Sequence, residues 1–147
     1  MFSRTLASLL LGTLAIAQQS ADRMVGTWKL DVEKSQMREF ASRTLRAERI
    51  APDTFRIEAD LVMKSGEKDH TVTVQICDGV ERHKEGAPPT VTETCTPDGT
   101  VIRKQDGKMV SEMRSTFSPD GKTQTITHKK LSKDGTWSEA VGIYVRK

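Results

Sequence analysis

Short turn signals recur through the chain at fairly regular intervals, and they constrain its fold more than any other feature. Each consists of Gly after Asp or Ser, a pair that suits tight connections because Gly accepts positive φ and Asp hydrogen-bonds to its own backbone. They are Ser65-Gly66, Asp78-Gly79, Asp98-Gly99, Asp106-Gly107, Asp120-Gly121 and Asp134-Gly135. Turns that recur in this way indicate consecutive antiparallel strands.

The segments between these turns alternate in polarity with a period of two, as strands with one buried face do. In residues 54–63 (TFRIEADLVM) apolar side chains alternate with Arg, Glu and Asp. In residues 70–76 (HTVTVQI) the same pattern predicts that Val72, Val74 and Ile76 face the core.

These segments predict an all-β fold, a single antiparallel up-and-down β-barrel of about eight or nine strands, because closing a long sheet removes its two exposed edges. One short helical turn is expected at Ser35–Ala41, after the first strand, with Ser35 as its cap. The expected strands lie near residues 25–31, 43–50, 54–64, 69–77, 89–96, 99–105, 109–118, 122–131 and 135–146.

The N-terminal stretch has the features of a secretory signal peptide. Arg4 precedes an apolar run that ends in the small-x-small pattern AIA at residues 15–17. The run is too short to remain as a helix across a bilayer core of about 30 Å. We therefore expect a signal peptide at 1–17, cleavage near Ala17, and one domain at 18–147 in a secreted or periplasmic protein. A buried or amphipathic N-terminal helix is the alternative.

The two cysteines, Cys77 and Cys95, are expected to form a disulfide because export leads to an oxidising compartment. Closing the loop between them would stabilise the protein by about 3 kcal/mol in the chain-entropy description. Two buried thiols are the alternative.

Charge and composition argue against several classes of function. The net charge is +3 and the charges alternate in sign, so we expect no basic surface for nucleic acid or for an anionic membrane. Only 5% of residues are aromatic, which leaves few rings for stacking bases, and no second apolar segment reaches membrane length. The three His residues lack metal-ligand spacing, and nucleotide-binding and hydrolase motifs are absent. We expect no metal and no cofactor.

Several polar and methionine side chains share the parity of the predicted core-facing positions. Such a set would line a small polar cavity, in which methionines adapt to apolar ligands. For each residue the alternative is an ordinary role, such as a solvated strand end, an outward position after a β-bulge, or a small filler in the core. The candidates are His70, Glu93, Met109, Ser111, Met113, Ser115, His128 and Glu139.

The order of elements resembles that of lipocalins, whose signature is a Gly-x-Trp strand at the start of a secreted meander. Here that strand contains Gly26 and Trp28. Residues 26–35 (GTWKLDVEKS), 118–127 (SPDGKTQTIT) and 140–147 (AVGIYVRK) are similar to a group of small exported bacterial lipocalin-like proteins. The chain is shorter than most lipocalins and lacks their large aromatic-lined loop at the open end.

The resemblance implies that Trp28 plugs the closed end of the barrel, that Arg146 packs over it, and that Gly26 lets the chain approach closely. An ordinary core position for Trp28 is the alternative. The implied function is non-covalent binding of a small apolar or amphipathic ligand inside the barrel. A filled barrel that acts as a structural or partner-binding module, and a small hydrolase or isomerase, are the alternatives. Nothing in the pattern indicates an oligomeric state.

Overall fold

The computed structural model describes residues 20–147, so the signal peptide expected at 1–17 lies outside the described residues. A 3₁₀-helix, η1 (Ala21–Met24), precedes an antiparallel sheet of ten strands. The strands are β1 (Gly26–Leu30), β2 (Phe40–Ala51), β3 (Thr54–Met63), β4 (Lys68–Ile76), β5 (Arg82–His83), β6 (Val91–Cys95), β7 (Val101–Gln105), β8 (Lys108–Phe117), β9 (Thr123–Leu131) and β10 (Trp137–Arg146). No helix among these residues is long and apolar enough to span a membrane.

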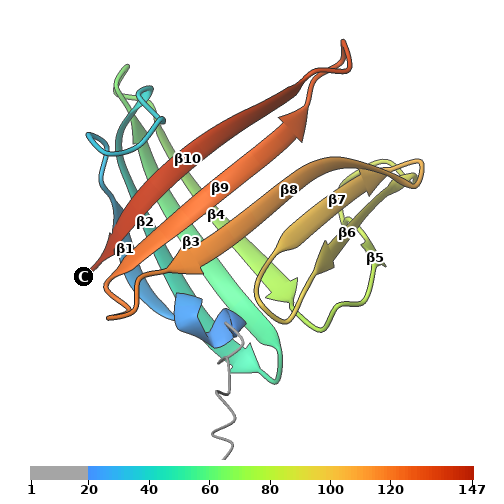
Figure 1. Ribbon diagram of the computed structural model, residues 1–147, viewed down its shortest axis with the longest axis horizontal. Coiled ribbons are helices and arrows are strands. Elements are labelled where there is room, and N and C mark those ends of the chain that lie inside the picture. Colours follow the sequence, from blue (N-terminus) through green and yellow to red (C-terminus); the bar gives the residue numbers. More distant parts are fainter. Residues whose placement is uncertain (1–19) are drawn as a thin grey trace, which may run out of the picture.

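The sheet is a meander that curls back on itself. Its strand order is β4-β3-β2-β1-β10-β9-β8-β7-β6-β5, so β1 pairs with the last strand as well as with β2. In Figure 1, β2, β3 and β4 lie behind β9 and β10, and β5 to β7 lie at the right. Within residues 20–147, β4 and β5 are the two edges and share no ladder. We call the gap between β4 and β5 the seam.

Two local predictions differ from the structure. Within the segment Ser35–Ala41, residues 35–39 form bends and a turn, β2 begins at Phe40, and no helical turn is present. Ser35 is buried, and its Oγ donates to the carbonyl oxygen of Asp31 at 2.6 Å and accepts from the amide of Ile143 at 2.8 Å. Ser35 therefore ties the loop to β10 instead of capping a helix. The two-residue strand β5 was not expected.

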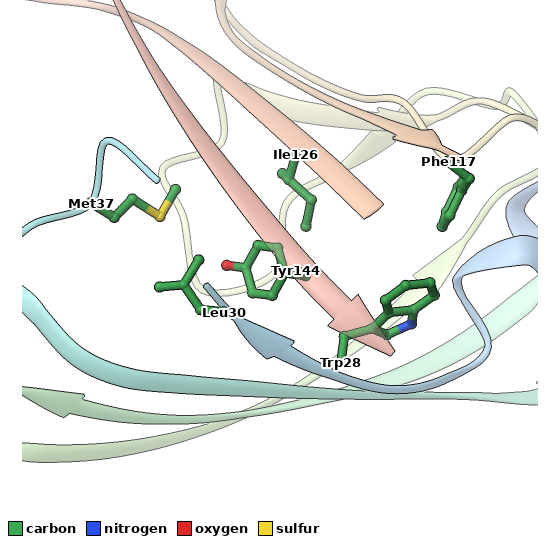
Figure 2. Close-up of a cluster of buried hydrophobic side chains, with 6 residues drawn as sticks. All are labelled: Trp28, Leu30, Met37, Phe117, Ile126 and Tyr144. Carbon is green, nitrogen blue, oxygen red and sulfur yellow. The ribbon is translucent and has the colours of Figure 1, made fainter. Parts of the chain in front are cut away.

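The main core lies between β1, β8, β9, β10 and the loop after β1. Its side chains point toward one another in Figure 2. Trp28 and Leu30 lie two residues apart on the inner face of β1. The register places Trp28 opposite Arg146 and Leu30 opposite Tyr144. The cluster consists of Trp28, Leu30, Met37, Phe117, Ile126 and Tyr144.

Trp28 lies at one end of the barrel and Arg146 covers it. The indole is 1% exposed, and its Nε1 donates to the carbonyl oxygen of Met24 at 2.8 Å. The guanidinium carbon of Arg146 lies 4.2 Å from the Trp28 ring centroid, and its Nη1 donates to the carbonyl oxygen of Val25. Gly26 has φ +132°, and a side chain there would meet the Arg146 guanidinium. The glycine makes room for this cation–π contact.

The predicted disulfide between Cys77 and Cys95 is confirmed. Both cysteines are buried, in a second cluster with Phe55 and Val101. Cys77 directly follows β4, and Cys95 is the last residue of β6. The bond therefore joins the two sides of the seam at one end, where the backbone ladder is interrupted.

The inward face of β4 is the opposite of the one predicted. The register pairs Phe55 with Gln75, Ile57 with Thr73 and Ala59 with Thr71, so the polar half of β4 shares the inner face of β3. The valines and Ile76 lie on the outer face and are 40–55% exposed. The prediction was wrong because Thr and Val are both β-branched and suit either face of a strand, which leaves the alternation with little contrast.

Candidate functional site

A cavity of about 170 Å³ lies inside the barrel, beside the main core. Its lining comes from η1 and from β1, β2, β3, β4, β8 and β9, together with the loop before β7. The larger apolar side chains are Met24, Trp28, Leu45, Ile57, Met113 and Ile126. The polar side chains are Arg43, Thr71, Thr73, Gln75, Ser115 and Gln124. The cavity is thus apolar on several sides and carries a limited set of polar groups.

Strand alternation and register bring these groups together. On β2, Arg43 and Leu45 are two residues apart and face inward, because Leu45 pairs with the buried Trp28. On β8 and β9 the register pairs Ser115 with Ile126, and both line the cavity. The side chains come from strands far apart in the sequence that the curled sheet brings face to face.

A second hollow, a groove of about 590 Å³, follows the seam. It is bordered by β4, by Val80 and residues 82–86, and by Glu93 and Cys95. Thr73 and Gln75 line both the groove and the interior cavity. The two hollows therefore adjoin at β4, the strand without a partner on its outer edge.

Arg43 is the cavity's cationic group. Its Nη1 donates to the hydroxyl oxygen of Tyr144 at 3.2 Å. No Asp or Glu among residues 20–147 lies within ion-pair distance of its guanidinium. Burial raises the pKa of Tyr144, so the phenol stays neutral and its own proton remains available for donation. Arg43 therefore presents a positive charge that no carboxylate neutralises.

Of the predicted cavity residues, Met113 and Ser115 line the cavity. Ser111 and His128 face the same interior from the neighbouring positions, with Ser111 Oγ 3.4 Å from His128 Nε2. Burial, and then the positive charges of Lys130, Arg103 and Arg43, lower the pKa of His128, which keeps its ring neutral.

The Ser111–His128 contact lacks the third group that nucleophilic catalysis uses. In a catalytic pair, a further residue orients the imidazole through its other nitrogen. The contact with Ser111 is the only hydrogen bond of the His128 ring within residues 20–147. The geometry therefore gives no support to a hydrolase assignment.

Glu93 and Met109 lie away from the cavity lining. Glu93 faces inward on β6, but it pairs with Arg103 at 3.0 Å and with Lys84 at 3.6 Å, and it borders the groove at the seam. Met109 is at the start of β8 and is 39% exposed.

His70 and Glu139 lie on the outer face of the barrel, so the prediction that they face inward was wrong. His70 Nδ1 lies 2.7 Å from Asp60 Oδ1, and this hydrogen bond, followed by the one from Arg46, lowers the pKa of Asp60. Glu139 faces Lys129 across the ladder at 4.0 Å. On β10 the neighbouring Trp137 suggested a buried face, but it is 48% exposed.

Sequence reasoning missed most of the polar lining. Arg43 lies two residues before Leu45, and Gln124 two residues before Ile126, so the same parity rule places both on the inner face once long polar side chains are accepted there. For Thr71, Thr73 and Gln75, the inward side chains of β4, the sequence pattern offers no such signal. Among residues 20–147 there is no group of three His, Cys, Asp or Glu that could hold a metal ion.

Comparisons with known proteins bear on the fold. No protein-family model matches the sequence, and no curated protein sequence matches it. Among solved structures, the wild-type fluorescent protein UnaG is similar, with a TM-score of 0.56 and 16% identity over 86% of this chain and 98% of UnaG. This chain has a lipocalin-like β-barrel fold.

Two further structures are similar to the lipocalin-like barrel over most of its length. The siderocalin Ex-FABP has a TM-score of 0.47 and 10% identity, covering 85% of this chain and 71% of its own. Bovine odorant-binding protein, solved with its natural ligand, has a TM-score of 0.45 and 15% identity, covering 89% and 76%. These values are lower than those for UnaG, on which the fold assignment depends.

Proposed function

We propose that the lipocalin-like barrel binds a small apolar or amphipathic molecule non-covalently in its interior. The observation that carries this proposal is the cavity with apolar walls and one guanidinium, that of Arg43, that no carboxylate neutralises. Arg43 is half-buried, and a charge that is partly withdrawn from water without an ion-pair partner carries a cost. A ligand with an acceptor or negatively charged group beside Arg43 would compensate for that cost, and its apolar part would contact residues such as Trp28 and Met113.

The volume of the cavity limits the part of the ligand that it holds. Pockets for drug-sized ligands measure about 300–1,000 Å³, whereas a cavity of about 150 Å³ accommodates a benzene ring. The cavity of about 170 Å³ therefore suits a ring or a short chain. A longer ligand would continue past Thr73 and Gln75 into the groove at the seam. In this arrangement Met113 and Ser115 contact the enclosed part, and Glu93 lies near the part in the groove.

The modest cavity also favours a second candidate function, a mostly filled barrel that acts through its surface. Side chains alone can fill a barrel of about eight strands. The outer face of β4 exposes Val72, Val74 and Ile76, which would suit contact with a partner. The two candidates differ in whether the folded protein takes up an apolar probe.

The proposal is tested by titration with phenylnaphthylamine, an apolar fluorescent probe. We expect saturable binding to the folded protein, with the emission rise that accompanies transfer out of water. Met113→Arg places an unpaired charge in the cavity and is expected to weaken binding by at least about tenfold. Met109→Arg, on the same strand but outside the lining, is the matched control and should bind as the unmodified protein does.

Circular dichroism must show that both variants are folded. If Met113→Arg is not, Ala59→Leu fills the same cavity with apolar atoms and replaces it. Failure of the folded, unmodified protein to bind both this probe and the smaller ring indole, which fits the cavity alone, would exclude interior binding and leave the filled barrel. Equal binding by the Met113 and Met109 variants would place the probe elsewhere.

We further propose that the protein is exported and that residues 1–17 are removed. Two features support this: the AIA sequence at residues 15–17 and a disulfide, which forms and persists in oxidising compartments. Expression of the full chain in an exporting bacterial host should yield a mature protein that starts at Gln18, with no free thiol. The intact mass measured before and after reduction reports both the cleavage site and the oxidation state of the cysteines. An uncleaved chain in the cytoplasmic fraction would contradict export.

A further inference from the structure

Among the described residues that line the cavity, Gln124 is the one buried polar side chain. It is 3% exposed, and it lies between Phe117 and Tyr144, its ladder partners on β8 and β10. These two neighbours belong to the main apolar core, so the amide group sits in surroundings that offer few hydrogen-bond partners. A glutamine at such a position is uncommon without a specific partner for its polar atoms.

The two ends of the Gln124 amide differ in their contacts. Nε2 donates to Ser115 Oγ at 3.3 Å, which orients the group. Oε1 accepts no hydrogen bond from any residue in the range 20–147 and has almost no contact with solvent. A buried acceptor without a donor costs about 1–3 kcal/mol. Gln124 also lines the cavity, so a small displacement of its amide toward the interior would bring Oε1 within reach of a bound molecule that supplies the missing donor.

We propose that Gln124 determines ligand specificity by accepting a hydrogen bond through Oε1 from an O–H or N–H group of the ligand. The inference rests on the proposed function, because it names the chemistry of the ligand in the same cavity. The ligand is then an apolar molecule, or the apolar end of a longer one, that carries a hydroxyl or an N–H group on its enclosed part. Arg43 lines the same cavity and takes the acceptor or negatively charged group of that ligand.

The size of the cavity and this donor requirement select a class of compound. A flat ring with one N–H or O–H, such as an indole or a phenol, fits about 170 Å³ and supplies the donor. A pure hydrocarbon or an ether of the same shape leaves Oε1 unpaired. Sites that hydrogen-bond a ligand reject the analogue without the group more strongly than they reject a change of one methylene.

The test uses indole and benzofuran, which have the same shape and differ in an N–H group and an ether oxygen. Binding of each to the full protein is measured by calorimetric titration. We expect indole to bind about tenfold more tightly than benzofuran, the preference that corresponds to one satisfied buried hydrogen bond. In Gln124→Leu the ratio of the benzofuran and indole dissociation constants should fall to nearly one, while benzofuran still binds. Gln75→Leu, which removes another lining glutamine, is the matched control and should keep the preference.

The possible outcomes separate this inference from the proposed function. If phenylnaphthylamine binds in the cavity but indole shows no preference over benzofuran, Gln124 is not a specificity residue and interior binding still stands. A preference for benzofuran, or a preference that Gln75→Leu abolishes and Gln124→Leu keeps, also overturns the inference. Failure of phenylnaphthylamine, indole and benzofuran alike to bind overturns the proposed function itself. Urea unfolding of both variants checks that each is folded, and a preference that survives in folded Gln124→Leu contradicts the assignment.

Discussion

Replacement of Trp28 by alanine is expected to lower the free energy of unfolding by about 3–5 kcal/mol, the range measured for large aromatic side chains in cores. The indole is almost fully buried and packs against Phe117, with ring centroids 5.8 Å apart. Alanine would also remove the hydrogen bond to Met24 and the cation–π contact with Arg146. Natural domains have only about 5–15 kcal/mol of stability in total, so this variant is expected to be close to unfolding at room temperature.

Urea unfolding followed by far-ultraviolet circular dichroism measures the loss, because the signal does not depend on the removed indole. Trp28→Phe retains an aromatic ring without the hydrogen bond and should lose considerably less stability. Trp137→Ala removes the other tryptophan, which is 48% exposed on the outer face, and is expected to change stability by less than about 1 kcal/mol. Equal losses for the alanine variants of Trp28 and Trp137 would contradict a structural plug at Trp28.

Removal of the disulfide is expected to lower the free energy of unfolding by about 3 kcal/mol, from the loop that it closes in the unfolded chain. The cysteines are 18 positions apart, and both side chains are buried with Phe55 and Val101. Because the bond also holds the two sides of the seam together, the Cys77→Ala, Cys95→Ala double variant should exchange a bound apolar probe faster than the unmodified protein.

A reducing agent supplies the internal check for this prediction. It should shift the urea midpoint of the unmodified protein toward that of the double variant, and it should leave the double variant unchanged. Stopped-flow dilution of bound phenylnaphthylamine measures the exchange rate. If the free energy of unfolding of the double variant lies within about 0.5 kcal/mol of that of the unmodified protein, the backbone ladder alone holds the barrel together.

Much of the fold followed from the sequence because local signals and tertiary needs agree in most strands. The Asp-Gly turns fix where strands end, and the alternation in residues 54–63 has high contrast, with charged residues between apolar ones. The segment Ser35–Ala41 is predicted to form a helical turn because its polar residues satisfy helix signals as well as loop signals. The deciding contact, between Ser35 and Ile143, joins residues 108 positions apart and leaves no local trace.

The candidate site was predictable only in part, since the inward face of a strand must be known before its polar residues can be assigned. Met113 and Ser115 were found because β8 also carries Phe117 at the same parity. The Thr and Val positions of β4 gave the wrong face. The unpaired acceptor of Gln124 depends on its distance to every other side chain, which no periodicity in the sequence expresses.

The seam gives the barrel wall one side that differs mechanically from all others. Displacing any other pair of neighbouring strands would rupture backbone hydrogen bonds, whereas moving β4 away from β5 ruptures none within the described residues. Thermal fluctuations should therefore open the wall mainly at the seam. The separation of β4 from β5 should be largest at the end far from Cys77 and smallest beside it. A molecule too large for the ends of the barrel would still have a lateral route inward, with its breadth limited by one covalent bond.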